Sequence, residues 1–224
     1  MKMQNGADAE IYRGGRRTSV PELISELAGP DPIAIAGAAA MIFGIGSELG
    51  NMAVQAWLTD SELSRVLVHE IAQKENRETS GMNKLRATVG VAVFPKNFDH
   101  IRKAAGSPPL AAVPPDQDAL EFELHLIPDV GPDIRLDILT TKQVGGEGAI
   151  AKFLAKFGEG IQQVEYEVTD VDRATKILVE RFGVKAIYPA TRPGADGTRV
   201  NFFLVPSEAG KKILIELVEP ARKP

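Results

Sequence analysis

The sequence predicts an α+β protein in which two βαβββ copies follow an N-terminal helical extension. Two strand-like segments, ATVGVAV and QQVEYEV, carry apolar side chains at alternate positions, which is typical of half-buried strands. Each is followed by a helical pattern, PKNFDHIRKAAG in one copy and DVDRATKILVERFG in the other. Each helix is followed by further strand patterns punctuated by proline and glycine. This repetition indicates a duplication, with a first module at 84–147 and a second at 148–219.

The chain before the duplication divides into two parts. Residues 1–17 are polar and rich in glycine and arginine, and we expect them to form a disordered tail. Residues 18–83 are expected to be a helical extension and linker. Capping-box patterns beginning at Ser19 and Thr59 predict two helix starts, with the linker at 74–83.

Composition excludes several classes of protein. The chain has 224 residues, a net charge of −4 and both signs of charge spread along it, so no large basic surface suggests nucleic-acid binding. It has no cysteine, which excludes disulfides and thiolate sites. We expect a cytoplasmic protein because the first residues lack a signal-peptide pattern.

One apolar segment, residues 32–46, raises the question of a membrane. It is shorter than the roughly 20 residues that a span needs, so we expect a buried helix or an oligomer contact and no membrane span. Its alanines and glycines would let another helix approach closely.

Alternation along the predicted strands collects polar side chains on one concave face. A strand sends successive side chains to opposite faces, and the helix-facing positions here are the apolar ones. The concave face then receives these residues: Glu123, His125, Asp137, Gln163, Glu165 and Glu216. Carboxylates, an amide and an imidazole together would suit a divalent ion.

The alternative is an ordinary wet sheet surface. We favour that interpretation for Glu121, Glu165 and Glu167, because acids are common on surfaces. Asp137 has Arg135 as a neighbour of opposite sign and is open to a plain salt bridge. Glu216 differs because it stands in the apolar run ILIELV, where a charge needs a partner or a function.

The stretches IAKFLAKFGEGIQQVEYEVTDVD, GADGTRVNFF and GKKILIELVE resemble the vicinal oxygen chelate superfamily, and within it the methylmalonyl-CoA epimerase branch. The resemblance covers residues 148–219 well, residues 84–147 more weakly, and residues 1–80 not at all. It implies paired βαβββ modules that form a U-shaped cleft around a divalent metal ion, and the homodimer that we expect suits such modules.

The resemblance also implies roles for particular residues. By position, the metal ligands fall on Thr88, Asp137, Gln163 and Glu216, and a catalytic base falls on Glu123. Thr88 and Gln163 stand where the epimerases have histidine, and threonine is a poor ligand. We therefore take Asp137, Gln163, Glu216 and His125 as the predicted metal ligands, with Glu123 and Glu216 as the predicted catalytic residues.

Three functions remain open at this point. The first is a glyoxalase- or epimerase-like isomerase or lyase that moves a proton next to a carbonyl of a small acid or acyl thioester with a divalent metal ion. The second is metal-free binding of a small molecule by the same fold, and the third is an assembly role for the N-terminal helices. For a coenzyme A ligand, the candidate phosphate contacts are Lys152, Lys156, Arg192, Arg199, Lys211 and Lys212.

Overall fold

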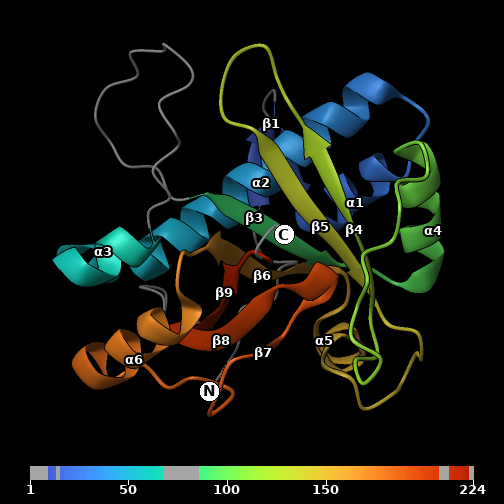
Figure 1. The fold of residues 1–224 in the computed structure, drawn as a ribbon. Helices are drawn as coiled ribbons and strands as arrows, with labels where there is room; N and C mark the ends of the chain where they lie inside the picture. The colour runs from blue at the N-terminus through green and yellow to red at the C-terminus, as the bar shows by residue number, and fades with distance from the viewer. Residues whose placement is uncertain (1–9, 14–15, 68–85, 207–211, 222–224) are drawn as a thin grey trace.

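The computed structural model describes residues 10–13, 16–67, 86–206 and 212–221, and its centre is one mixed sheet of seven strands with the order β4-β5-β3-β6-β9-β8-β7 (Figure 1). The α+β prediction is confirmed. The strands of this sheet are β3 (Ala87–Ala92), β4 (Leu120–Leu126), β5 (Ile134–Thr140), β6 (Gly160–Glu167), β7 (Arg192–Pro193), β8 (Arg199–Pro206) and β9 (Lys212–Glu219).

The two halves of the sheet repeat one pairing pattern. In each half the first strand lies parallel to the last, β3 to β5 and β6 to β9, and an antiparallel strand flanks the last one. The antiparallel pair β3–β6 joins the halves. The first half has three strands in place of the four expected. The segment before β4 contains prolines at 108, 109, 114 and 115, which lack the N–H groups that a ladder needs, although the Ala111 N–H between them donates to the Glu121 carbonyl of β4 at 3.0 Å.

Helices from both parts of the chain cover one face of this sheet. The helices are α1 (Val20–Leu27), α2 (Pro32–Val54), η2 (Gln55–Thr59), α3 (Ser61–Leu67), α4 (Pro95–Ala104), α5 (Ala149–Phe157), α6 (Val171–Phe182) and the short η3 (Ala195–Gly197). Buried side chains of α1, α2 and α4 pack with those of β3, β4 and β5, and those of α2, α3 and α6 pack with β6, β8 and β9. We call this the helix face and the opposite side the open face. Helix α5 packs on the open face, where its Ile150 and Leu154 lie against Ala92 of β3 and Leu139 of β5.

Helix α2 lies directly on the sheet at two glycines. A Cβ at Gly46 would stand 2.4 Å from a methyl group of Val89 on β3, and one at Gly50 would stand 2.6 Å from Val164 and from Tyr166 on β6. The Tyr166 hydroxyl donates to Asn51 Oδ1 at 3.0 Å. The small residues of α2 thus allow the close packing that the sequence predicted. The packing partner is the sheet, whereas the prediction was another helix.

The argument that this segment is too short for a membrane does not hold. The helix runs well past residue 46, and Pro32–Thr59 is long and apolar enough to cross a membrane by length and composition. The glycine contacts with β3 and β6 give α2 a place in the core. The helix continues because Ser47 and Glu48 are compatible with helix and nothing in the sequence stops it before Gln55.

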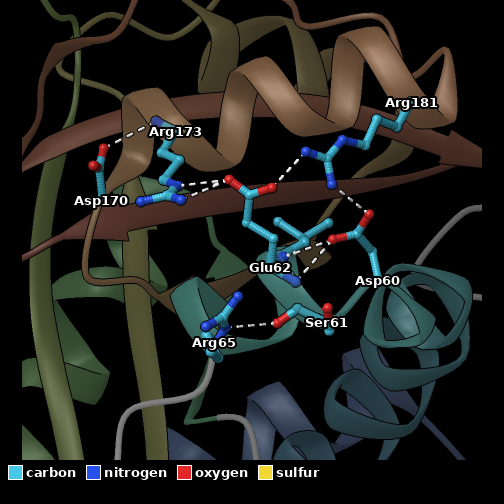
Figure 2. A network of polar contacts seen from close by, with 8 residues as sticks. Asp60, Ser61, Glu62, Arg65, Asp170, Arg173 and Arg181 are labelled. Carbon is cyan, nitrogen blue, oxygen red and sulfur yellow. Dashed lines mark hydrogen bonds and ion pairs between the residues drawn. The ribbon is translucent and has the colours of Figure 1, made fainter.

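Helix α3 is tied to α6 by an ion-pair network (Figure 2). Glu62 accepts from Arg173 at 2.7 Å and pairs with Arg181, which also donates to Asp60 Oδ2 at 2.8 Å. The other oxygen of Asp60 caps α3 by accepting from the backbone N–H of Leu63 at 3.0 Å. The helix start predicted around Thr59 is present, with Asp60 as its capping residue.

Two further predictions concern the N-terminal part. The capping box at Ser19 is present, since the Ser19 N–H donates to Glu22 Oε2 at 2.8 Å. Part of the tail expected to be disordered, residues 1–17, instead contributes to an antiparallel pair of short strands, β1 (Glu10–Arg13) and β2 (Arg16–Ser19). The segment EIYR is rich in strand-forming residues, and that signal was missed. The linker predicted at 74–83 lies outside the described residues.

Candidate functional site

The open face gathers polar side chains from three strands near the centre of the sheet, with β3 between the first and the second of them. Asp137 comes from β5, Gln163 and Glu165 come from β6, and Glu216 comes from β9. In register, Asp137 pairs with Gly90, Gly90 with Gln163, and Glu165 with Glu216. Because their strand neighbours Leu136, Val164 and Ile215 belong to the helix-face cores, these polar side chains project from the other face.

Gly90 makes room at the centre of this face. A Cβ there would stand 2.5 Å from Cγ of Gln163 and 3.2 Å from a methyl group of Leu139. Asp137, on one side of β3, and Glu165, on the other, share a hydrogen bond that lowers the pKa of Asp137 and raises that of Glu165. Two carboxyl groups can share such a bond only when one of them holds a proton.

Gln163 holds the second link of the cluster. Its Nε2 donates to Glu216 Oε2 at 2.5 Å and to Glu165 Oε1 at 3.3 Å, and both Gln163 and Glu216 are buried. We call Asp137, Gln163, Glu165 and Glu216 the acid cluster. One amide therefore bridges two carboxyl groups that would otherwise repel each other when ionised.

Burial raises the pKa of each acid in the cluster. For Glu165 and Glu216 the pKa lies well above its ordinary value, chiefly because burial penalises the charged form and next because of the negative charge of Asp137. The pKa of Asp137 is also raised by burial, although its hydrogen bond with Glu165 acts in the opposite direction. The three groups titrate together, so protons belong to the cluster rather than to single residues.

Glu121 on β4 extends this acidic region toward the edge of the sheet. Burial raises the pKa of Glu121 to about 7, and the charges of Asp137 and Asp196 contribute further. A carboxyl group with that pKa is present in both protonation states at neutral pH, which suits an acid or a base in proton transfer.

The predicted base Glu123 and the predicted ligand His125 lie at the rim. Glu123 stands opposite Asp137 in register, but its carboxylate is half-exposed and pairs with Arg135 at 3.1 Å. His125 Nε2 lies 3.1 Å from Asp133 and its Nδ1 lies 3.9 Å from Glu123. Of the predicted residues, the structure thus brings together Asp137, Gln163 and Glu216 and leaves Glu123 and His125 outside the cluster.

The predicted metal ligands do not fit a metal ion as they are arranged. In the described part of the chain, no group of three or more histidine, aspartate or glutamate side chains could hold one. Gln163 directs its NH₂ group, a donor, at two of the carboxyl groups, and Asp137 and Glu165 are bonded to each other. His125, the predicted imidazole ligand, is hydrogen-bonded to Asp133 through its Nε2.

Glu121 and Glu165, interpreted above as surface acids, are half-buried on the open face, and burial raises the pKa of both. Glu167 is half-buried as well and is ion-paired with Arg86 at 3.0 Å, as a surface acid would be. A usable signal was present in the sequence: Glu165 lies two residues after Gln163 on one strand, so both share the face of the candidate ligand.

The candidate phosphate contacts are largely engaged elsewhere. Arg192 pairs with Asp116 at 2.8 Å, Arg199 pairs with Asp172 and Glu219, and Lys152 pairs with Glu147 at 2.8 Å. Lys156 lies over the Phe157 ring, 4.9 Å from its centre. Lys211 lies outside the described residues.

Comparisons with known proteins found similar solved structures. No family model and no curated protein sequence matches the chain. Methylmalonyl-CoA epimerase from Mycobacterium tuberculosis is 32% identical over 65% of this chain and 93% of its own, with a TM-score of 0.48. A hypothetical protein from Bacillus halodurans C-125 is 28% identical over 63% and 96%, also at 0.48.

A third similar structure carries a bound ligand. It is a methylmalonyl-CoA epimerase in complex with methylmalonyl-CoA and NH₄⁺, 27% identical over 60% of this chain and 92% of its own, with a TM-score of 0.47. These epimerases belong to the vicinal oxygen chelate superfamily. The matches span about two thirds of this chain. Over that part, the chain resembles methylmalonyl-CoA epimerases of that superfamily.

Proposed function

We propose that this protein catalyses proton transfer at a carbon next to the carbonyl of a small acid or acyl thioester, using buried carboxyl groups. The observation that carries the proposal is the acid cluster, in which three carboxyl groups with raised pKa values meet around Gln163 on one face of the sheet. The sequence resemblance to the methylmalonyl-CoA epimerase branch supports the choice of substrate class.

The cluster supplies the two groups that such a reaction needs. A base must take the proton from carbon, and a donor must stabilise the negative oxygen of the resulting enolate. Asp137 and Glu165 share a hydrogen-bonded proton, so one of them holds a negative charge and can accept a proton. Glu216, kept neutral by burial, can donate a hydrogen bond to the enolate oxygen, as neutral carboxylic acids do in apolar sites.

This mechanism assigns no step to a metal ion, because the donors present are bonded to one another. It keeps Glu216 as a catalytic residue from the sequence prediction and replaces Glu123 as the base by the Asp137–Glu165 pair. Glu121, with its pKa of about 7, is placed to exchange protons between the cluster and solvent.

Deuterium uptake at the acidic carbon tests the proposal. We would incubate the protein with methylmalonyl-CoA in D₂O, with chelator and separately with added Co²⁺, and follow the mass of the thioester. We expect uptake in chelator and a loss of about 10²-fold or more in Glu165→Gln, since positioned acids and bases contribute roughly 10²–10⁴ in rate. Glu167→Gln, two residues along the same strand and ion-paired at the surface, is the matched control and should retain uptake.

A non-catalytic binding protein is the second candidate. Thr88 and Gln163 in place of the family histidines favour it, and so does a cluster whose groups already satisfy one another. Calorimetric binding of the same thioester without any deuterium uptake, equal with and without chelator, would support binding and exclude the catalytic proposal.

A further inference from the structure

The outer edge of strand β4 is open where the matching edge in the second half of the sheet is covered. β4 and β8 hold the same place, because each is the antiparallel strand that flanks the last strand of its half. In the second half, β7 pairs with the outer side of β8. In the first half, β4 ends the sheet order, and no described strand pairs with its outer side. The strand that the first half lacks therefore leaves β4 as an edge.

The backbone groups of Glu123 and His125 point outward from this edge. Leu139, opposite Glu121 in register, gives its carbonyl to the Val93 N–H at the end of β3. Leu139 thus turns its backbone toward β3, and Glu121 turns its own away from β5. Because this direction alternates along an antiparallel strand, the backbone groups of Glu123 and His125 face the same way as those of Glu121.

The segment before β4 bonds only to the start of the edge. The Ala111 N–H donates to the Glu121 carbonyl at 3.0 Å. If that pairing continued as an antiparallel strand, Pro109 would stand opposite Glu123, and proline has no N–H to donate. Within the described ranges, the outward N–H and carbonyl groups of Glu123 and His125 therefore have no backbone partner.

β4 also lacks features that commonly keep an edge strand from pairing. Unpaired backbone groups are a template for another strand, and short length, proline or lysine commonly blunts such an edge. β7, at the other end of the sheet, is two residues long and contains Pro193. β4 is seven residues long and contains neither proline nor lysine. Ile127 and Val130, just past its end, are 74% and 89% exposed and add apolar side chains beside the edge.

We propose that the edge of β4 pairs with the same edge of a second copy of this chain, antiparallel and centred on Leu124, so that the two seven-stranded sheets become one. In that register Glu123 of each copy stands opposite His125 of the other, and the two residues exchange both backbone hydrogen bonds. A two-fold axis relates the copies, and the same patch is used on both. The inference goes beyond the proposed reaction, because it concerns assembly and uses no residue of the acid cluster.

Charge selects this register. Glu123 and Asp137 stand opposite each other within one copy, as do His125 and Arg135. In the proposed register the acidic pair of one copy faces the basic pair of the other, which stabilises a strand pair. A register centred on Glu123 would instead place two Glu123 carboxylates opposite each other, and like charges there are destabilising. A register centred on His125 would leave Glu123 opposite Ile127, without a charged partner.

Sedimentation velocity of the full chain tests the pairing without any ligand. We expect the parent protein to sediment with the mass of two chains. His125→Pro removes an outward N–H and no bond to β5, so the fold should tolerate it and the protein should sediment as one chain. His125→Gln keeps that N–H and a polar side chain, and as the matched control it should remain a dimer. Circular dichroism confirms that each variant is folded.

Charge reversal tests the register. Glu123→Lys places a cation against the basic pair of the other copy, and His125→Glu places an anion against the acidic pair. Each change acts twice in a symmetric dimer, so each variant alone should dimerise about tenfold more weakly than the parent. An equimolar mixture of the two variants should recover dimer, because the new lysine of one chain then meets the new glutamate of the other.

Three results would overturn the proposal. One is a parent protein that sediments as a single chain up to its solubility limit. Another is a dimer that survives His125→Pro, since the copies then meet on another surface, such as the outward side of α2. The third is a mixture of the charge variants that associates no better than its components, which excludes the register centred on Leu124. Should His125→Pro fail to fold, the charge variants still decide the question.

Discussion

Replacing Glu121 with glutamine should stabilise this protein at neutral pH and leave it unchanged in acid. In the unfolded chain Glu121 ionises near 4.5, whereas burial holds its pKa near 7 in the folded protein. The folded state therefore keeps a proton that the unfolded state has lost, and stability falls as the pH rises from about 4.5 to about 7 and is then level. A shift of this size corresponds to about 3 kcal/mol.

Urea unfolding followed by circular dichroism at pH 4 and pH 8 measures the effect. At pH 8, Glu121→Gln should recover up to about 3 kcal/mol, or roughly 6–12 °C in melting temperature for a chain of this size. At pH 4 the variant and the parent should match. Glu123→Gln, on the same strand but half-exposed beside Arg135, is the matched control and should show no such gain. A Glu121→Gln protein that gains nothing at pH 8, or gains equally at pH 4, would show that Glu121 carries no burial penalty.

Two further predictions concern the packing of the helical extension. Gly46→Ala places a Cβ 2.4 Å from Val89, and this overpacking should lower the free energy of unfolding by roughly 1–3 kcal/mol, measured by thermal unfolding. Gly44→Ala, whose Cβ would meet nothing within 4 Å, is the control and should be neutral or stabilising because alanine favours helix. Arg181→Met removes both of its ion pairs to α3, and the small loss of stability expected in low salt should disappear at 1 M NaCl, since salt screens exposed charges; a loss independent of salt would assign the contact to packing.

Much of the fold could be predicted from local pattern. Alternation in ATVGVAV and QQVEYEV identified β3 and β6, and helix capping identified the starts of α1 and α3, because both depend on residues close in sequence. Two features were not predicted: the first half has three strands and not four, and α2 extends to Val54. The first depends on which backbone groups find partners, and the second on a sheet surface assembled from distant residues.

The site was predicted in part for the same reason. Glu216 was identified because its apolar neighbours adjoin it in sequence, and Asp137 and Gln163 were placed with it by strand alternation. Whether an acid on that face is exposed to solvent or buried depends on which other segments of the chain pack against it. Asp137 and Glu165 interact across β3, and that contact links residues 28 positions apart, between 137 and 165, which alternation alone does not reveal.

The seating of α2 on β6 has a consequence for how the chain is made. Gly50 meets Val164 and Tyr166, which are synthesised more than a hundred residues later. On the ribosome, the apolar helix α2 therefore emerges before the strand β6 on which it packs has been synthesised. Nascent chains in that condition expose aggregation-prone surface, so production of this protein in cells should depend on chaperone supply more steeply than its final stability would suggest.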